Sequence, residues 1–401
     1  MKPDVHDFSL AALRRTYLHP HALYAELRAH DPIYFDATSQ CWLVTSHAPM
    51  VAILDDARFS SQLGASAAMF PPVVSKQLLF LDGDVHHRAQ SVMLRPLATL
   101  LKSQTTAIKA YARELLDTAV ARGEIDTVQD FSARLSLWTI AHLLGMPTDD
   151  MAQLQQLAQW SNTYGDVTSG YFQGNFKDVQ RLADYFRALV EEKRQHPGDD
   201  LLSAFVLAGD VYTPDELIAN CMMVFTAGRI TTEKLLGDGL PTLTAQWAEL
   251  REKFAAAPDA LPKTLGEELL RLITPTRYVM RMALEDVDLS ERFPGNHLIH
   301  QGQRILLFLD AADHDPETFS DPEHIEAQRR PNRHIAFGYG PHQCPGANLA
   351  RAEIQAALEA LLTVAEDLQP QPGATPTFNP NPNLGGATSW PLRIAGDSTG
   401  N

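Results

Sequence analysis

The segment that most constrains this chain is 337–346, FGYGPHQCPG, which places a cysteine among glycines directly before a helix-like run. Glycine adopts left-handed turn conformations without steric cost, so Gly338, Gly340 and Gly346 predict a tightly folded loop. Cys344 stands just ahead of ANLARAEIQAALEALL, whose apolar spacing predicts an α-helix. Backbone N–H groups at a helix start favour the thiolate form of such a cysteine. A loop of this kind can direct one sulfur at a metal. The alternative is that Cys344 is an ordinary small core residue beside a glycine-rich turn.

The rest of the chain is dominated by helical periodicity. Apolar residues recur at three- and four-residue intervals near residue 20, over 107–122 and over 182–194. Short strand signals occur at 33–35, 42–45 and 305–309. Since 45% of the 401 residues are apolar, the chain can build a large core. We therefore expect one mainly helical domain with a small β part.

Composition excludes several classes of function. The formal net charge of −16 argues against general nucleic-acid binding, which needs a basic surface. The three cysteines, Cys41, Cys221 and Cys344, are too few and too scattered for a disulfide framework, which fits a reducing cytosol. The N-terminus lacks the apolar region of a signal peptide, and no run of 18 apolar residues predicts a membrane span. We expect a cytoplasmic protein without a membrane anchor.

The cysteine segment, read as FGxGxHxCxG followed by xxLAR, resembles the haem-binding signature of cytochromes P-450. Further blocks occur in the order of that family: PGDDLLSA at 197–204, the E-x-x-R motif at 268–271, and AADHDPETF at 311–319 with Asp321-Pro322. The segment ending in LGMP at 144–147 also matches. The resemblance implies a cytochrome P-450 fold over 1–401 as a single domain. Residues 1–19 would form an N-terminal arm and residues 396–401 a disordered tail.

The resemblance implies that haem b, iron protoporphyrin IX, is bound with the Cys344 thiolate on its iron. His86, Arg281 and His342 match the residues that hold the haem propionates. Gln90 departs from the family, which usually has an arginine at that place. The residues at the positions of the family's remaining cofactor contacts are Gln90, with this departure, and Ala227, Gly228, Phe337, Gly338 and Gly346.

The E-x-x-R motif predicts a structural ion pair. Glu268 and Arg271 are three residues apart, so both side chains lie on one helix face. Many such pairs are only surface contacts. In the family, the pair forms a triad with an arginine ahead of the cysteine loop, and Arg329 is at the matching position.

The apolar-rich segment 221–240 predicts a long helix, and AGRITT within it resembles the family's A-G-x-[DE]-T-T. The resemblance implies catalytic roles for Thr231 and Thr232 in delivering protons to oxygen. The alternative for Thr231 is a hydroxyl that only bonds back to the preceding turn. Ile230 takes the place of the family's acid. Arg229 either pairs with a carboxylate such as Asp238 or faces the pocket and holds an anionic substrate group.

By resemblance, the substrate pocket draws on four regions of the chain. The predicted pocket residues are Phe70, Val73, Leu79, Arg229, Val279 and Met280, with Met69, Val74, 164–172 and 387–389 nearby. The first region is largely apolar, which favours a lipophilic substrate. Each of these residues could equally be part of the core.

The resemblance implies a monooxygenase, an oxidoreductase that hydroxylates or epoxidises a lipophilic small molecule. Electrons would come from a ferredoxin and a ferredoxin reductase, with the enzyme a cytoplasmic monomer and natural-product tailoring its role. The missing acid at Ile230 leaves an alternative, a haem enzyme that performs peroxide-driven oxidation, isomerisation or dehydration. A non-catalytic haem sensor is disfavoured because Thr231 and the pocket segments are retained. Substrate identity, and whether the substrate is free or carrier-bound, stay open.

Overall fold

The computed structural model describes residues 9–171 and 176–396. Its residues group into two compact units: Met1–Gln62, Glu268–Cys344 and Pro380–Asn383 form the first, and Leu63–Glu267, Pro345–Asn379 and Leu384–Asn401 the second. The single domain of the sequence analysis stays a prediction. Phe172, in a predicted pocket segment, lies outside the described residues. The same holds for the expected tail 396–401 except Gly396, which is described. Within the described ranges, no helix is long and apolar enough to cross a membrane.

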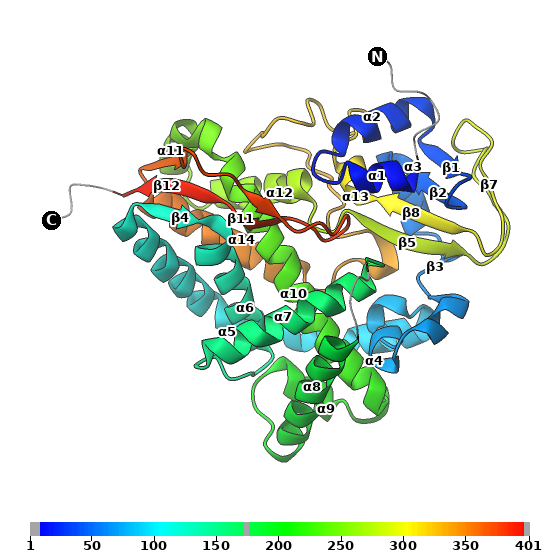
Figure 1. Ribbon diagram of the computed structural model, residues 1–401, viewed down its shortest axis with the longest axis horizontal. Helices are drawn as coiled ribbons and strands as arrows, with labels where there is room; N and C mark the ends of the chain where they lie inside the picture. The colour runs from blue at the N-terminus through cyan, green and yellow to red at the C-terminus, as the bar shows by residue number, and fades with distance from the viewer. Residues whose placement is uncertain (1–8, 172–175, 397–401) are drawn as a thin grey trace. The chain divides into compact units, whose positions relative to one another are not determined.

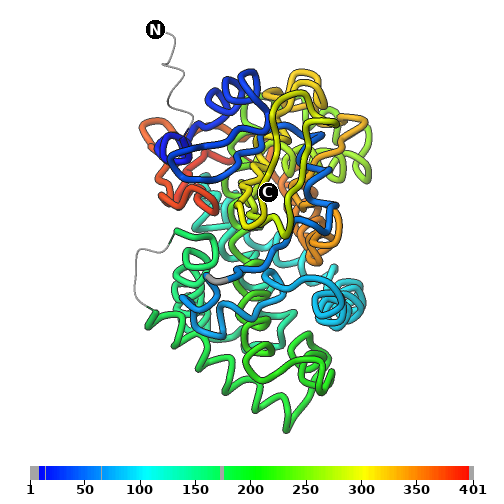
Figure 2. The backbone as a smooth tube through the Cα atoms, turned by 90° about the vertical axis from the view of Figure 1, so that its right-hand side faces the viewer, coloured from blue at the N-terminus to red at the C-terminus, as the bar shows by residue number. Residues whose placement is uncertain are grey.

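The first unit is built on a five-stranded sheet with the strand order β1-β2-β8-β5-β3. Its strands are β1 (Ile33–Asp36), β2 (Cys41–Val44), β3 (Phe59–Ser60), β5 (Tyr278–Ala283) and β8 (Arg304–Phe308). β2 and β8 are parallel and the other pairs antiparallel, so strands more than 250 residues apart in the sequence, blue and yellow in Figure 2, lie side by side. The three predicted strands are confirmed as β1, β2 and β8. A second sheet pairs β6 (Val287–Asp288) with β7 (Leu298–Ile299).

Both faces of this sheet are covered. Trp42 and Val44 of β2 belong to one buried apolar cluster, and Cys41 and Leu43 belong to another. Successive side chains of a strand point to opposite faces, so a strand buried on both faces is continuously apolar. The helices of this unit are α1 (Leu10–Arg15), α2 (His21–His30), α3 (His47–Leu54) and α13 (Leu309–Asp313), together with the end of α12 (Leu261–Ile273).

The second unit is mainly helical (Figure 1). Its helices are α4 (Pro72–Ser75), α5 (Gly83–Arg122), α6 (Ala133–Leu143), α7 (Met151–Thr168), α8 (Lys177–Gln195), α9 (Leu201–Leu207), α10 (Pro214–Thr242), α11 (Trp247–Ala256), the start of α12, and α14 (Ala347–Val364). Its strands are β4 (Glu124–Asp126), β9 (Asp367–Pro370) and β12 (Pro391–Ala395) in one sheet, and β10 (Thr377–Phe378) and β11 (Ala387–Ser389) in another.

The long helix predicted over 221–240 is confirmed as part of α10, which packs against α4, α6, α7, α8 and α14. Thr213 caps it: the hydroxyl accepts from the Glu216 N–H, and the Glu216 carboxylate accepts from the Thr213 N–H. Pro214 follows at the first helical position, where its missing N–H costs nothing. This capping box fixes where α10 begins.

Asp313 ties the end of α12 to the chain that enters the cysteine loop. One carboxylate oxygen accepts from the Ile335 N–H at 2.7 Å, and the other accepts from the Thr274 hydroxyl at 2.9 Å. The side chain is fully buried, and this burial raises the pKa of the Asp313 carboxyl. The fold therefore favours the neutral form of this group.

We expect Asp313→Asn to raise the free energy of unfolding at neutral pH by about 1 kcal/mol, the size typical of single substitutions. An amide can accept from Ile335 and donate to Thr274 without a charge. Because the pKa of Asp313 is raised on folding, its stabilising effect is present below the unfolded pKa and is lost as pH rises through the folded pKa. Denaturant unfolding at several pH values measures this. A variant that is less stable at neutral pH than at acidic pH, relative to wild type, would contradict the assignment.

Candidate active site

Cys344 ends a loop whose turns are made by glycine. The Gly338 N–H donates to the Ile335 carbonyl, and the Cys344 N–H donates to the Phe337 carbonyl, both at 2.8 Å. Gly338 and Gly340 have φ angles of 70° and 71°, so the predicted need for glycine is confirmed at both. The prediction was wrong for Gly346, whose φ of −84° is open to any residue. Gly346 instead caps the start of α14.

Gly340 also lies against backbone. A Cβ at this position would be 2.7 Å from the carbonyl oxygen of Leu54, at the end of α3. The next residues form a short 3₁₀ turn, Gly340–His342, and the His342 Nε2 lies 3.3 Å from the Ser61 hydroxyl. The cysteine loop is therefore packed against α3 at Gly340 and lies within hydrogen-bond distance of Ser61 at His342.

The three cysteines differ in burial, and therefore in their ability to bind a metal. Cys41 is buried in the sheet core, with its sulfur 3.4 Å from the Ser39 carbonyl. Cys221 is fully buried, and this burial raises the pKa of its thiol, so a thiolate is strongly disfavoured there. Cys344 is exposed and lies two residues before the cap of α14. Only Cys344 thus has the accessibility and the backbone setting of a metal-binding thiolate.

The predicted triad is confirmed. Glu268 and Arg271 are fully buried, and the guanidinium donates Nε to Oε2 at 3.0 Å and Nη2 to Oε1 at 2.8 Å. The Arg329 Nε lies 3.0 Å from both oxygens of the same carboxylate. Burial opposes ionisation of Glu268, but the hydrogen bonds from Arg271, the Glu326 N–H and Arg329 outweigh it and lower the pKa of Glu268.

The two arginines of the triad also donate hydrogen bonds to backbone carbonyls of the surrounding segments. Arg271 donates to the carbonyls of Asp313 at 2.9 Å and Pro322 at 2.7 Å. Arg329 donates to the Ser320 carbonyl at 2.8 Å. Segments that precede the cysteine loop are thereby fixed to α12.

α10 carries the predicted catalytic threonines. Thr232 is buried, and the Thr231 hydroxyl donates to the Ala227 carbonyl at 2.7 Å, the back-bonded arrangement weighed above as the alternative. Ala227 is exposed although most of α10 is buried, and Thr231 is half-buried beside it. Catalytic roles for Thr231 and Thr232 stay predictions.

Arg229 is buried and engaged in structural bonds. Its guanidinium pairs with Glu233 at 2.5 Å and donates to Ser161 and Asn162 of α7. This supports the ion-pair alternative over the pocket-facing one, although the partner is Glu233 and not Asp238. Asp238 instead accepts from the Ala387 N–H at 2.7 Å. The i, i+4 spacing from Arg229 could have identified Glu233, whereas no sequence signal pointed to the α7 residues.

Ile230 leaves no carboxylate in the acid's place on α10. Its Cδ1 lies so close to Gly165 of α7 that a Cβ on that glycine would be 2.9 Å away. The position therefore holds hydrocarbon packed against a neighbouring helix.

The predicted haem-propionate residues are divided between the units. His86 is buried in the first turn of α5, and Gln90 follows one turn later in the same unit. Arg281 on β5 is buried, and it donates to the Met280 carbonyl at 2.9 Å. Like the role of His342, the roles of these residues toward a propionate stay predictions.

The predicted substrate residues differ in exposure. Val73 on α4 is buried, whereas Leu79 and Met280 are exposed. Phe70 and Val279 are half-buried.

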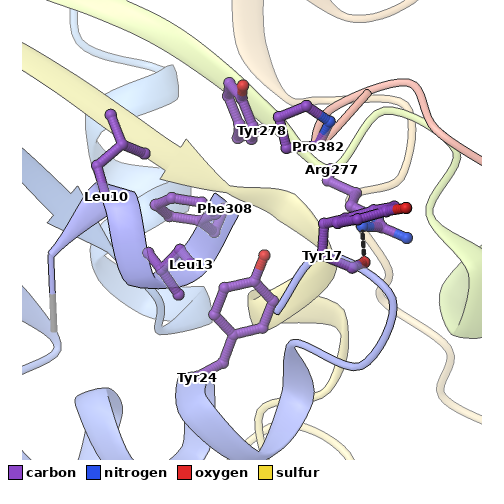
Figure 3. A pocket seen from close by; sticks show the side chains of 8 residues that line it. All are labelled: Leu10, Leu13, Tyr17, Tyr24, Arg277, Tyr278, Phe308 and Pro382. Carbon is purple, nitrogen blue, oxygen red and sulfur yellow. Dashed lines mark hydrogen bonds between the residues drawn. The ribbon is translucent and has the colours of Figure 1, made fainter. Parts of the chain in front are cut away.

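A separate pocket in the first unit is lined by Leu10, Leu13, Tyr17, Tyr24, Arg277, Tyr278, Phe308 and Pro382 (Figure 3). Arg277 donates a hydrogen bond to the Tyr17 carbonyl beside it. None of the predicted catalytic, cofactor or substrate residues lines this pocket, so it is not the predicted substrate pocket.

The fold and the cysteine loop agree with comparisons to known proteins. The family profile described as "Cytochrome P450" matches residues 263–386. The chain is 32% identical to the biotin biosynthesis cytochrome P450 of Bacillus subtilis, over 86% of this chain and 88% of the relative. The chain belongs to the cytochrome P450 family. This P450 is also 30% identical to the mycinamicin IV hydroxylase/epoxidase of Micromonospora griseorubida, over 90% and 89% of the two chains.

Solved structures confirm the predicted fold class. The crystal structure of P450BioI in complex with an acyl carrier protein ligated to hexadec-9Z-enoic acid superposes with a TM-score of 0.84. That similarity is at 28% identity and covers 94% of this P450 and 99% of P450BioI. Membership of the family gives this P450 monooxygenase chemistry and haem b as its cofactor. The exposed thiol of Cys344 fits that cofactor, whereas the thiols of Cys41 and Cys221 are buried.

We expect Glu268→Gln to destabilise the protein by about 3–5 kcal/mol, because Arg271 and Arg329 would keep buried charges without a carboxylate. The matched control is Glu267→Gln. The neighbouring Glu267 pairs with Arg351 at 2.7 Å with both side chains about a third or more exposed, so its loss should cost only about 0–1 kcal/mol. Denaturant unfolding and haem content measure both. Equal effects of the two substitutions would contradict the structural role of the triad.

We expect Cys344→Ser to lose the red-shifted band of the reduced carbon-monoxide complex that marks thiolate ligation, or to lose haem altogether. A serine hydroxyl remains neutral at neutral pH and is a poor substitute for a thiolate. Cys221→Ala serves as the control, because that thiol is buried and should leave the band in place. An unchanged spectrum in Cys344→Ser would refute the ligand assignment.

Proposed function

We propose that this P450 hydroxylates or epoxidises a lipophilic small molecule as a cytoplasmic monomer, with electrons from a ferredoxin and a ferredoxin reductase. The observation that carries the proposal is the α10 surface at Ala227 and Thr231, where small side chains remain accessible on a helix that is mostly buried. Such a surface leaves room for substrate beside the threonine. Natural-product tailoring is the proposed role.

The residues divide the chemistry as follows. Bound haem supplies the redox chemistry of oxygen activation, held by the Cys344 thiolate, with His86, Arg281 and His342 proposed for its propionates. The Thr231 hydroxyl donates a hydrogen bond to the Ala227 carbonyl, so the lone pairs of its oxygen can accept a hydrogen bond from water. Ile230 offers no proton. Protons must therefore arrive through water at Thr231 or through a group on the substrate.

The relatives support the proposed substrate class. One relative is a hydroxylase/epoxidase of mycinamicin IV, and P450BioI binds a carrier-ligated long-chain fatty acid. The apolar residues Phe70, Val73, Leu79 and Val279 are proposed to contact such a substrate, with Met280 beside them. Because P450BioI takes its ligand on a carrier protein, free acids and their carrier-bound forms both belong in a ligand screen read by the shift of the haem absorption band.

A second candidate function follows from the packing of Ile230 against α7. Without an acid on α10, this P450 could carry out oxidation driven by peroxide, or isomerisation or dehydration. These reactions need no protons delivered to bound dioxygen.

We expect Thr231→Ala to divert reducing equivalents into hydrogen peroxide, because the variant loses the hydroxyl that orders water. General-acid assistance is typically worth about 10²–10⁴-fold in rate, so the productive step should slow and product formed per electron should fall while peroxide formed per electron rises. The measurement uses a ligand from the screen, a surrogate ferredoxin system, and assays of reductant, peroxide and product.

Thr231→Ser is the control, because it keeps a hydroxyl at the same position and should retain most of the coupling. Unchanged coupling in Thr231→Ala, together with full turnover on peroxide alone, would favour the second candidate and reject the first.

A further inference from the structure

Two neighbouring residues of α10, Arg229 and Ile230, both contact α7. They occupy the two central positions of AGRITT, between Gly228 and the threonines, and Ile230 stands where the family motif has its acid. The proposed chemistry uses neither side chain. Their contacts therefore call for a separate explanation.

Arg229 bonds to one turn of α7 through a single nitrogen. Its Nη2 donates to the Ala158 carbonyl at 3.2 Å, to the Ser161 hydroxyl at 3.0 Å, and to the Asn162 side-chain oxygen. Its Nη1 pairs with Glu233 on α10 itself, which balances the charge. Only 4% of the Arg229 side chain is exposed, so water screens these bonds little.

Ile230 packs against α7 one turn further along. A Cβ added to Gly165 would lie 2.9 Å from the Ile230 Cδ1, 3.5 Å from the Thr226 Cγ2 and 3.7 Å from the Leu384 Cδ1. The absence of a side chain at Gly165 thus makes room for the end of Ile230. The hydrogen bonds from Arg229 and the packing of Ile230 against Gly165 together hold α7 in place against α10.

We propose that Arg229 is a positioning residue that holds α7 on α10, with Ile230 seated against Gly165 as the second part of the same interlock. The α10 position where the family carries an acid is used here to join two helices. This deepens the proposed function and rests on it in one respect, because the family resemblance predicts that the end of α7, from Tyr164 onward, borders the substrate. An α7 that is fixed in this way should retain bound ligand by slowing its dissociation.

The first test compares amide hydrogen exchange over residues 157–168 in haem-loaded wild type, Arg229→Met and Glu233→Gln. Arg229→Met removes the three hydrogen bonds that Arg229 donates to α7, so exchange there should rise at least about tenfold, equivalent to about 1.4 kcal/mol. Glu233→Gln keeps these bonds and leaves an amide oxygen to accept from the Arg229 Nη1, so it can lower overall stability but should raise exchange over residues 157–168 much less than Arg229→Met does. Unchanged exchange in Arg229→Met, or an equal rise in Glu233→Gln, would overturn the proposal.

The second test changes the sizes of the two packed side chains, at Gly165 and Ile230, and leaves the buried charge of Arg229 in place. Gly165→Ala should loosen α7, because the new methyl group would meet the Ile230 Cδ1. Ile230→Val removes that carbon, so the double variant Gly165→Ala/Ile230→Val should return exchange of residues 157–168 toward the wild-type rate. If the double variant is no better than Gly165→Ala alone, the two residues are not seated against each other and the interlock is refuted.

Ligand dissociation separates this inference from the proposed function. With a ligand found by the shift of the haem band, stopped-flow dissociation should be at least about fivefold faster in Arg229→Met and close to wild type in Glu233→Gln. Faster exchange of α7 with unchanged dissociation would overturn the part of the inference that concerns substrate. Failure of every ligand to turn over with a ferredoxin system would instead count against the proposed function and leave the exchange results intact.

Discussion

One buried carboxylate organises the first unit. Glu268 binds Arg271 and Arg329 at once, and both arginines extend to backbone carbonyls in segments that have no regular secondary structure. Loops of that kind cannot satisfy their own carbonyl groups, so charged donors must reach them from elsewhere. The triad supplies those donors from one point at the end of α12. The segment that the triad holds in this way leads directly into the cysteine loop.

α10 shows how a change of one side chain alters the role of its neighbours. Hydrocarbon at Ile230 favours close contact with α7, which is possible only because Gly165 has no side chain. Beside it, Arg229 is buried with its charge balanced by Glu233 and its donors used on α7. A carboxylate at position 230 would have to be desolvated in the same contact, which would carry a large cost. Proton delivery and helix packing therefore compete for this position.

Much of the architecture could be predicted from the sequence because it depends on local patterns and on a motif. Short strand signals located β1, β2 and β8, apolar spacing located α10, and the family motif paired Glu268 with Arg271 and Arg329. The expectation for Gly346 was wrong, since the chain there enters a helix with an ordinary negative φ. The α7 partners of Arg229 could not be foreseen, because they lie 67 and 68 positions away in the sequence and are polar residues of unremarkable spacing. Contacts of this kind depend on how helices cross, which no local pattern records.

The backbone at Gly340 packs against the backbone at the end of α3, and the contact leaves no space for a side chain at position 340. The atom that a methyl group at Gly340 would meet is the carbonyl oxygen of Leu54, and a backbone atom cannot rotate away as the end of a side chain can. A larger residue at Gly340 would therefore displace either the end of α3 or the turn Gly340–His342, and Cys344 lies two residues beyond that turn. The position of the sulfur thus depends in part on a helix that ends almost three hundred residues earlier in the chain.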